Sequence, residues 1–134
     1  MIYRALGNTG LQVSEIGLGC EGFTEQEGMG TYALVDAAAD AGINYFDLYS
    51  PDPNLRLHLG KALAGRRDQF IIQAHLCSVW KDGQYKRTRI LEEVQAGFED
   101  LLHQLHTDHV EIGMIHYVDS LKDWQAVAEG PVMR

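Results

Sequence analysis

The sequence has few cysteines and few basic residues, and each shortage excludes a class of protein. Its 2 cysteines, Cys20 and Cys77, are far apart and form no CxxC pair, so neither a disulfide framework nor a zinc knuckle is indicated. The 11 Lys and Arg residues stand against 19 Asp and Glu, which leaves a net charge of -8. We therefore expect no nucleic-acid partner and no anionic membrane partner.

Long apolar runs are also missing. No stretch approaches the roughly 18 apolar residues that a membrane-spanning helix requires. The first residues lack the charged segment and apolar run of a secretory signal, so we expect a soluble, cytoplasmic protein. The 134 residues, of which 46% are hydrophobic, are near the common size of one domain and can bury a core.

A strand followed by a helix recurs along the chain. Turn residues in GNTG, at 7–10, predict a β-hairpin ahead of these repeats. Apolar strands are expected at 15–20, 43–48, 68–76 and 109–117, and helices at 31–41, 54–65, 88–105 and 121–130. Thr31 is expected to cap the first of these helices and Gly42 to end it. The segment CSVWKDGQYKR, at 77–87, is expected to be a long loop.

This alternation predicts an α/β fold with a parallel sheet, because parallel strands need a crossover connection. An open doubly wound sheet and part of a (β/α)8 barrel both fit the pattern. GLGCEG, at 17–22, matches G-x-G-x-x-G, but the next helix is expected only from Thr31, too far away to receive a pyrophosphate. We therefore predict one incomplete domain over residues 1–134: a partial (β/α)8 TIM barrel of about four βα units, preceded by the hairpin.

Polar and small side chains gather where the expected strands end. In a barrel these ends share one mouth, where acid and base groups are usually placed. A lone histidine there is often only structural, and an aspartate beside prolines is often a helix cap. In chain order these residues are Gly19, Cys20 and Glu21, then Asp47 and Tyr49, then His75 and Cys77, and last His116 and Tyr117.

Several motifs together resemble the N-terminal half of an aldo-keto reductase. LGNTGLQVSEIGLG is similar to the opening hairpin and first strand of that family, AADAGINYFDLYS to its second helix-to-strand passage, LGKAL to the following helix and DHVEIGMIHY to its fourth strand. The resemblance implies a (β/α)8 barrel that reduces a small carbonyl substrate with NADP as cofactor. It places Gly19, Cys20, Glu21, Gly22 and Asp47 near the nicotinamide and its ribose.

The family's catalytic tetrad consists of Asp, Tyr, Lys and His, and the resemblance assigns each position. Asp47 matches the aspartate and His116 the histidine, whereas Asp52 stands at the tyrosine position and His75 at the lysine position. An exposed Asp, with a reference pKa of about 3.9, is ionised at neutral pH and cannot donate a proton, while an imidazole can. The catalytic candidates are therefore Asp47, His116, His75, Tyr49 and Asp52, with His75 and Tyr49 as possible proton donors.

The length of the chain adds a further expectation. A (β/α)8 barrel needs about 250 residues, and the family binds most of the NADP phosphates and adenine with its second half. We therefore expect a fragment that is inactive alone, and that associates with itself through its two open sheet edges and an uncovered apolar face.

Two other functions stay open. One is a non-enzymatic half barrel that binds a small ligand or a protein partner. The other is an enzyme without a nicotinamide, in which Asp47, Asp52, His75 and His116 transfer protons. These four residues follow no metal-ligand spacing, so no metal is predicted. Trp80 and Tyr85 of the expected loop are candidates for one wall of a substrate pocket.

Overall fold

The computed structural model describes residues 1–25 and 28–133, and its centre is a parallel sheet. The strands β3 (Leu18–Gly19), β4 (Tyr45–Leu48), β5 (Ile71–Leu76) and β8 (Ile112–Ile115) are hydrogen-bonded in the order of the sequence. Every pair is parallel. A doubly wound sheet would reverse its order at a switch point, whereas the wall of a barrel does not. The predicted α/β fold is confirmed, and the strand order is that of a barrel.

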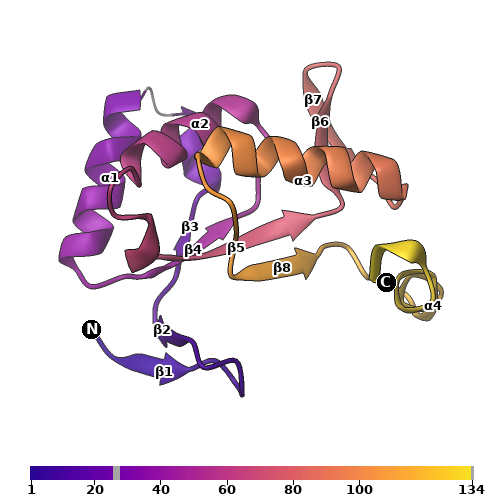
Figure 1. Ribbon diagram of the computed structural model, residues 1–134, viewed down its shortest axis with the longest axis horizontal. Coiled ribbons are helices and arrows are strands. Elements are labelled where there is room, and N and C mark those ends of the chain that lie inside the picture. The colour runs from indigo at the N-terminus through magenta and orange to yellow at the C-terminus, as the bar shows by residue number, and fades with distance from the viewer. Residues whose placement is uncertain (26–27, 134) are drawn as a thin grey trace.

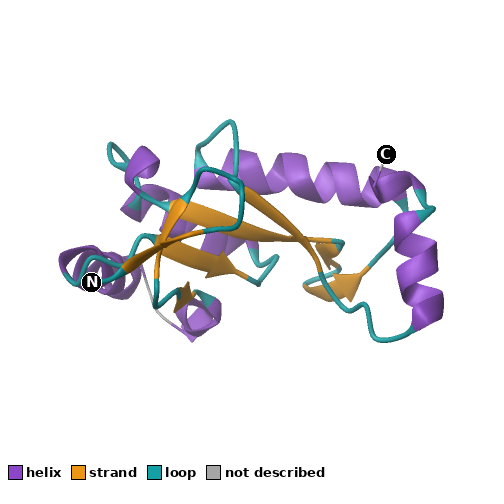
Figure 2. Ribbon diagram, turned by 90° about the horizontal axis from the view of Figure 1, so that it is seen from below, coloured by secondary structure: helices purple, strands orange, loops and turns teal. Residues whose placement is uncertain are grey.

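Three helices lie together on one side of the sheet (Figure 1). They are α1 (Gly28–Asp40), α2 (Pro53–Ala62) and α3 (Leu91–Leu105). The fourth helix, α4 (Leu121–Ala128), stands apart beyond the end of β8 (Figures 1 and 2). Short 3₁₀ turns lie at Glu21–Glu25, Arg67–Gln69 and Pro131–Met133. Each of the four predicted helices is therefore present.

Helix ends follow partly from local sequence. Gly42 has a φ of 79° just after α1, and its N–H bonds back to the carbonyl of Ala39, so the expected end is confirmed. Ser120 caps α4 by accepting a hydrogen bond from the N–H of Asp123. The expected cap at Thr31 is wrong, because this residue lies inside α1 and is fully buried. Packing of the first turn overrides the low helix propensity of its glycines.

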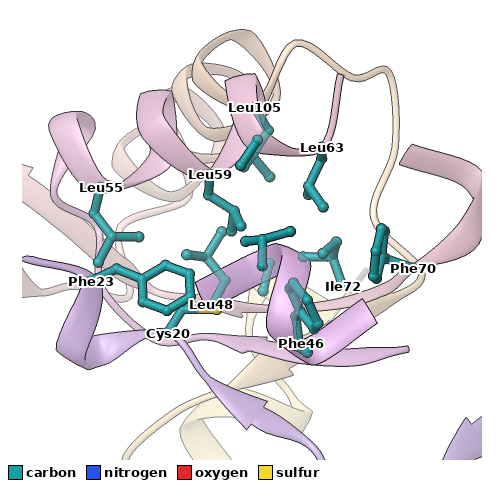
Figure 3. Close-up of a cluster of buried hydrophobic side chains, with 14 of the residues drawn as sticks. Cys20, Phe23, Phe46, Leu48, Leu55, Leu59, Leu63, Phe70, Ile72 and Leu105 are labelled. Carbon is teal, nitrogen blue, oxygen red and sulfur yellow. The ribbon is translucent and has the colours of Figure 1, made fainter. Parts of the chain in front are cut away.

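The hydrophobic core lies between the helices and the sheet (Figure 3). Alternate residues of β4, Phe46 and Leu48, point toward the helices and are buried. Phe46 packs on Phe70 with ring centroids 4.9 Å apart. Leu59 of α2 and Leu105 of α3 reach the same cluster from above. Each large apolar side chain buried here contributes about 1.5–3 kcal/mol to folding, which anchors the helices to the sheet.

The opposite face of β4 and β5 is polar. Tyr45, Asp47, Gln73 and His75 alternate with the core residues and are linked to one another by hydrogen bonds. The expected uncovered apolar face is therefore only partly present. Strand alternation assigns most apolar residues of β4 and β5 to the helix side, but Ile71 shares the face of Gln73 and His75, and β8 adds apolar side chains beside them.

Two hairpins flank the sheet. The predicted N-terminal hairpin is confirmed as β1 (Tyr3–Ala5) and β2 (Gln12–Ser14). The Asn44 side chain holds it near the start of β4, since it donates to the Gln12 carbonyl and accepts from the Ser14 N–H. The hairpin therefore lies at the N-terminal ends of the strands, away from the mouth where the candidate residues lie.

The segment 77–87 is a second hairpin, so the expected long loop is wrong. Its strands β6 (Ser78–Lys81) and β7 (Gln84–Arg87) pair antiparallel. Asp82 and Gly83 turn between them with φ values of 54° and 77°, as a two-residue turn of the Asp-Gly type requires. The turn signal is present in the sequence, but the Lys and Gln residues around it hide the strand alternation.

Gly60 marks the closest approach of α2 and α3, and it yields a test of this packing. A Cβ at Gly60 would lie 2.6 Å from the carbonyl oxygen of Gln104 and 2.7 Å from the Cα of Leu105. Those are backbone atoms, so the helices would have to separate. We expect Gly60→Ala to lower the free energy of unfolding by about 1–3 kcal/mol in chemical denaturation, although alanine is the better helix former.

Gly22→Ala is the matched control, because a Cβ there would meet nothing within 4 Å. This variant should stay within about 0.5 kcal/mol of the unmodified chain. A Gly60→Ala variant as stable as the unmodified chain would contradict the close packing of α2 on α3.

Candidate active site

A cavity of about 440 Å³ lies at the C-terminal ends of the sheet strands. Functional residues of α/β barrels concentrate at this end. The structure brings all the predicted site residues except Asp52 and Gly22 to this cavity. The residues that line it are Gly19, Cys20, Glu21, Asp47, Tyr49, His75, His116 and Tyr117.

A chain of hydrogen bonds connects three strands behind this cavity. The Oδ1 atom of Asp47 lies 2.8 Å from Nε2 of Gln73 and 2.7 Å from Nε2 of His75. The other ring nitrogen of His75, Nδ1, is 3.1 Å from Nδ1 of His116. An ionised carboxylate can only accept, so Nε2 of His75 carries a proton. The site is therefore an Asp47–His75–His116 cluster, with Gln73 as a further donor to Asp47.

Strand register explains why these side chains meet. Asp47 is paired with Gln73, and His75 is paired with Met114, two residues before His116. Residues two apart on a strand share a face, so all the polar members point to the same side. Sequence reasoning did not single out Gln73, although its position two residues before His75 already places it on that face.

Burial and neighbouring charges shift the pKa values of two groups in the site. The pKa of His116 is lowered, first by its burial and then by the neighbouring His75. The pKa of the Cys20 thiol is raised to about 12 by burial and by the charge of Asp47. Cys20 is fully buried in the core, so its thiol stays protonated and unreactive.

Tyr49 belongs to an aromatic group at the mouth of the cavity. Its hydroxyl lies 3.0 Å from that of Tyr117, and its ring stacks on Tyr85 with centroids 5.9 Å apart. The pKa of Tyr49 is raised, mainly by the hydrogen bond with Tyr117. Tyr49 is therefore a weaker acid than a free phenol, which disfavours it as a proton donor at neutral pH.

The β6–β7 hairpin supplies one aromatic side chain to this group. Tyr85 of β7 contacts Tyr49 but is not among the residues that line the cavity, and Trp80 lines a separate cavity between the hairpin and α3. Arg89, which follows the hairpin, donates from Nη2 to the carbonyl oxygens of His116 and Tyr117, at 2.5 and 3.0 Å. Nothing in the sequence pointed to Arg89, because its contact depends on the folded path of the chain after β8.

The structure does not bring Asp52 to the cavity. Asp52 caps α2, where its Oδ1 accepts a hydrogen bond from the N–H of Asn54 at 2.8 Å. Gly22 lies in the 3₁₀ turn after β3 and is also outside the cavity lining. Arg56, near the same loop, is buried and binds the carbonyl oxygen of Gly97 at 3.3 Å. Burial lowers the pKa of its guanidinium to about 10, and it connects α2 to α3.

Gly19 keeps one wall of the cavity open. A Cβ at Gly19 would have no neighbour within 4 Å, so a side chain there would project into free space beside Asp47, its partner in the sheet. The lining includes the carboxylates of Glu21 and Asp47 and no Lys or Arg, so it does not suit the phosphates of a dinucleotide.

The described residues form neither a metal-binding group nor a membrane-spanning helix. Within residues 1–25 and 28–133, no three or more His, Cys, Asp and Glu side chains are grouped to hold a metal ion. In the same part of the chain, no helix has both the length and the apolar composition to span a bilayer.

Comparison with known proteins identifies relatives of nearly the whole chain. Residues 15–130 match the model of the aldo/keto reductase family. The chain is 32% identical to aldo-keto reductase YhdN of Bacillus subtilis, over 96% of its own length and 42% of the relative. It is 31% identical to the uncharacterized oxidoreductase YrpG of the same organism, over 96% of its length and 44% of that protein. The chain thus spans less than half the length of these curated relatives.

Solved structures show the same fold. The holo form of aldo-keto reductase AKR11C1 from Bacillus halodurans has a TM-score of 0.77 at 24% identity, covering 97% of this chain and 47% of that one. An aldo-keto reductase from Klebsiella pneumoniae in complex with NADPH has a TM-score of 0.68 at 19% identity, covering 97% and 47%. Because these proteins are aldo-keto reductase barrels, the sheet of this chain is confirmed as part of a (β/α)8 barrel.

The hydrogen bond between Tyr49 and Tyr117 yields a second test. Tyr117→Phe removes one hydroxyl and keeps the ring that stacks on His116. We expect the pKa of Tyr49 to fall toward the ordinary phenol value of about 10, followed by NMR of its ring carbons as the pH is raised. Tyr3→Phe, in the distant N-terminal hairpin, should leave this pKa unchanged. If the Tyr49 pKa is the same in both variants, the hydrogen bond is not its cause.

Proposed function

The chain belongs to the aldo/keto reductase family, and we propose that the protein containing it is an NADP-dependent oxidoreductase that reduces a small carbonyl substrate. The observation that carries this proposal is the meeting of Asp47, His75 and His116 beside the open wall at Gly19. Two proton-carrying rings and a space for a flat ring then share one cavity. The NADPH complex of the Klebsiella pneumoniae relative supports the choice of cofactor.

Each group in the cavity has a part in this chemistry. Gly19 and Asp47 would face the nicotinamide and its ribose, and NADPH bound there would supply the hydride for the carbonyl carbon. The carbonyl oxygen needs a proton, and an imidazole is a side chain that can supply one. Asp47 fixes the orientation of His75 by accepting from its Nε2. The aromatic group of Tyr49, Tyr85 and Tyr117 would form an apolar wall for the substrate.

The sheet edges and the cellular location complete the proposal. Among the described residues, β3 and β8 are each hydrogen-bonded to a single neighbouring strand of the sheet. We propose that these edges pair with further barrel strands, either from the same polypeptide or from a second copy of the chain. Cys20 and Cys77 are free and buried, which is consistent with a reducing compartment, and we include a cytoplasmic location in the proposal.

The decisive experiment measures NADPH oxidation by the whole protein with a panel of aldehydes and ketones. We expect turnover with at least one of them. His116→Ala should lower kcat by about 10²–10⁴-fold, the usual contribution of a positioned acid. His103→Ala removes an exposed histidine of α3 and should not change kcat. NADPH binding without any turnover would instead favour the non-enzymatic half barrel, and full activity of His116→Ala would exclude His116 from catalysis.

The open wall at Gly19 gives a separate test of cofactor binding. Gly19→Val would place three carbon atoms in the cavity beside Asp47. We expect NADPH to bind about tenfold or more weakly by fluorescence titration, because a clash of about 1–3 kcal/mol corresponds to that loss. Ala37→Val adds a similar bulk on the exposed side of α1 and should leave the affinity unchanged. Equal affinity in the two variants would place the nicotinamide elsewhere.

A further inference from the structure

The contact between His75 and His116 restricts how protons can be arranged on the two rings. Their Nδ1 atoms lie 3.1 Å apart, and the two rings are nearly perpendicular at 85°. Two nitrogens at this distance share one proton, so one ring donates and the other accepts. Nε2 of His75 already donates to Asp47 at 2.7 Å. Two choices remain: which histidine holds the proton between the two rings, and whether Nε2 of His116 is protonated.

Three arrangements satisfy these bonds. In the first, His75 is protonated on both nitrogens, its Nδ1 donates to His116, and His116 therefore carries its own proton on Nε2. In the second, which holds the same number of protons, His75 is neutral and His116 is protonated on both nitrogens. In the third, which holds one proton fewer, His75 is neutral, His116 donates from Nδ1, and Nε2 of His116 is bare. His116 lines the cavity, and Nε2 is the ring nitrogen that His75 does not engage. The number of protons on the pair thus decides whether His116 can donate from Nε2 into the cavity.

We propose that His116 gives its Nε2 proton to the oxygen of the carbonyl substrate and is recharged at Nδ1 by His75. This inference rests on the proposed function, in which NADPH is the reductant. As the oxygen gains negative charge, the Nε2–H bond of His116 breaks and an O–H bond forms. At the same time the Nδ1–H bond of His75 breaks and an Nδ1–H bond of His116 forms. One proton leaves the pair, and His75 ends neutral and still bonded to Asp47.

The surroundings favour storing the extra proton on His75. Asp47 of β4 contacts His75 directly, whereas the guanidinium of Arg89 lies against the backbone of His116. Burial and the proximity of His75 lower the pKa of His116, in keeping with a neutral ring there. Five other titratable groups surround the pair. Tyr49 lies edge-on to both rings, Tyr117 stacks on His116, and Tyr85 lies beyond Tyr49. Asp119 is near His116, and Glu21 lies on the cavity wall.

Tyr49 does not compete with His116 as the donor in this arrangement. Its hydroxyl is engaged by Tyr117 at 3.0 Å, and this bond raises its pKa. This transfer of a proton from His75 through His116 to the substrate, the relay, also predicts how the reaction rate depends on pH. The proton-loaded pair is the reactant for carbonyl reduction, so kcat/KM for reduction falls as the pH rises past the pKa of the pair. Oxidation of the alcohol needs the pair that has lost this proton, so kcat/KM for oxidation rises over the same pH range.

The test combines ¹⁵N NMR of the histidine rings with the pH dependence of the reaction. In the whole protein we expect His75 and His116 to titrate in one shared step, during which His116 changes from its Nε2–H to its Nδ1–H form. The midpoint should match that of kcat/KM. His75→Asn keeps a donor near the Nδ1 position but cannot titrate, so His116 should titrate alone and the reduction rate should fall by about 10²-fold. His103→Asn, on the exposed side of α3, should change neither the shared step nor the rate.

Separate titrations of the two rings in the unmodified protein would overturn the relay, and so would a pH profile that His75→Asn leaves unchanged. Neither result would exclude carbonyl reduction itself. A shared titration in a protein that never oxidises NADPH would overturn the proposed function and leave the shared proton supported. Should His75→Asn fail to fold, His116→Asn gives the same information, because His75 should then titrate alone.

Discussion

The parallel pairing of β4 with β5 is the contact on which the rest of the structure depends. Phe46 pairs with Ile72 and faces the helices, whereas Asp47 pairs with Gln73 and faces the cavity. A shift of register by one residue would turn the apolar set toward the cavity and the polar set into the core. Burial of the apolar set against α2 and α3 therefore holds the catalytic candidates in their relative positions. Core and site are two faces of one strand pair.

We propose that the site differs from that of its family in the groups that supply a proton. His75 stands at the position that the resemblance assigned to a lysine, and it lies between a carboxylate and a second imidazole. A lysine there would be a permanent positive charge near neutral pH, while a histidine can gain and lose a proton in that range. Asp52, which the resemblance assigned to the tyrosine position, caps α2. In the proposed site the proton therefore comes from residues of β5 and the end of β8, and not from the loop after β4.

The β6–β7 hairpin packs beside the cavity and contacts one of its lining residues, Tyr49. Val79 of β6 lies so close to Gly97 of α3 that a Cβ at Gly97 would be 2.7 Å from its Cγ1 atom. This contact seats the hairpin on α3, and Tyr85 of β7 then reaches Tyr49. The aromatic wall of the cavity therefore depends on a glycine in a helix that carries no site residue itself.

Much of the fold and site could be predicted from the sequence, because hydrophobic periodicity and turn preferences depend on residues that are close together in the chain. The alternation of apolar and polar residues predicted the four strands and four helices, and strand ends predicted the mouth where Asp47, Tyr49, His75 and His116 meet. The family motifs led to the same residues. Missing from that prediction were the hairpin at 77–87, the helical start before Thr31 and the polar network across the sheet.

The sequence by itself determined the order of elements and which residues lie at the strand ends, since both depend on periodicity and turn chemistry within a few positions. Only the tertiary structure decided what each side chain touches. The bond from His75 to His116 joins residues 41 positions apart, and the contact of Tyr49 with Tyr117 spans 68. Such contacts depend on strand register and on the paths of the intervening helices. No local pattern encodes whether two titratable groups will come within hydrogen-bonding distance.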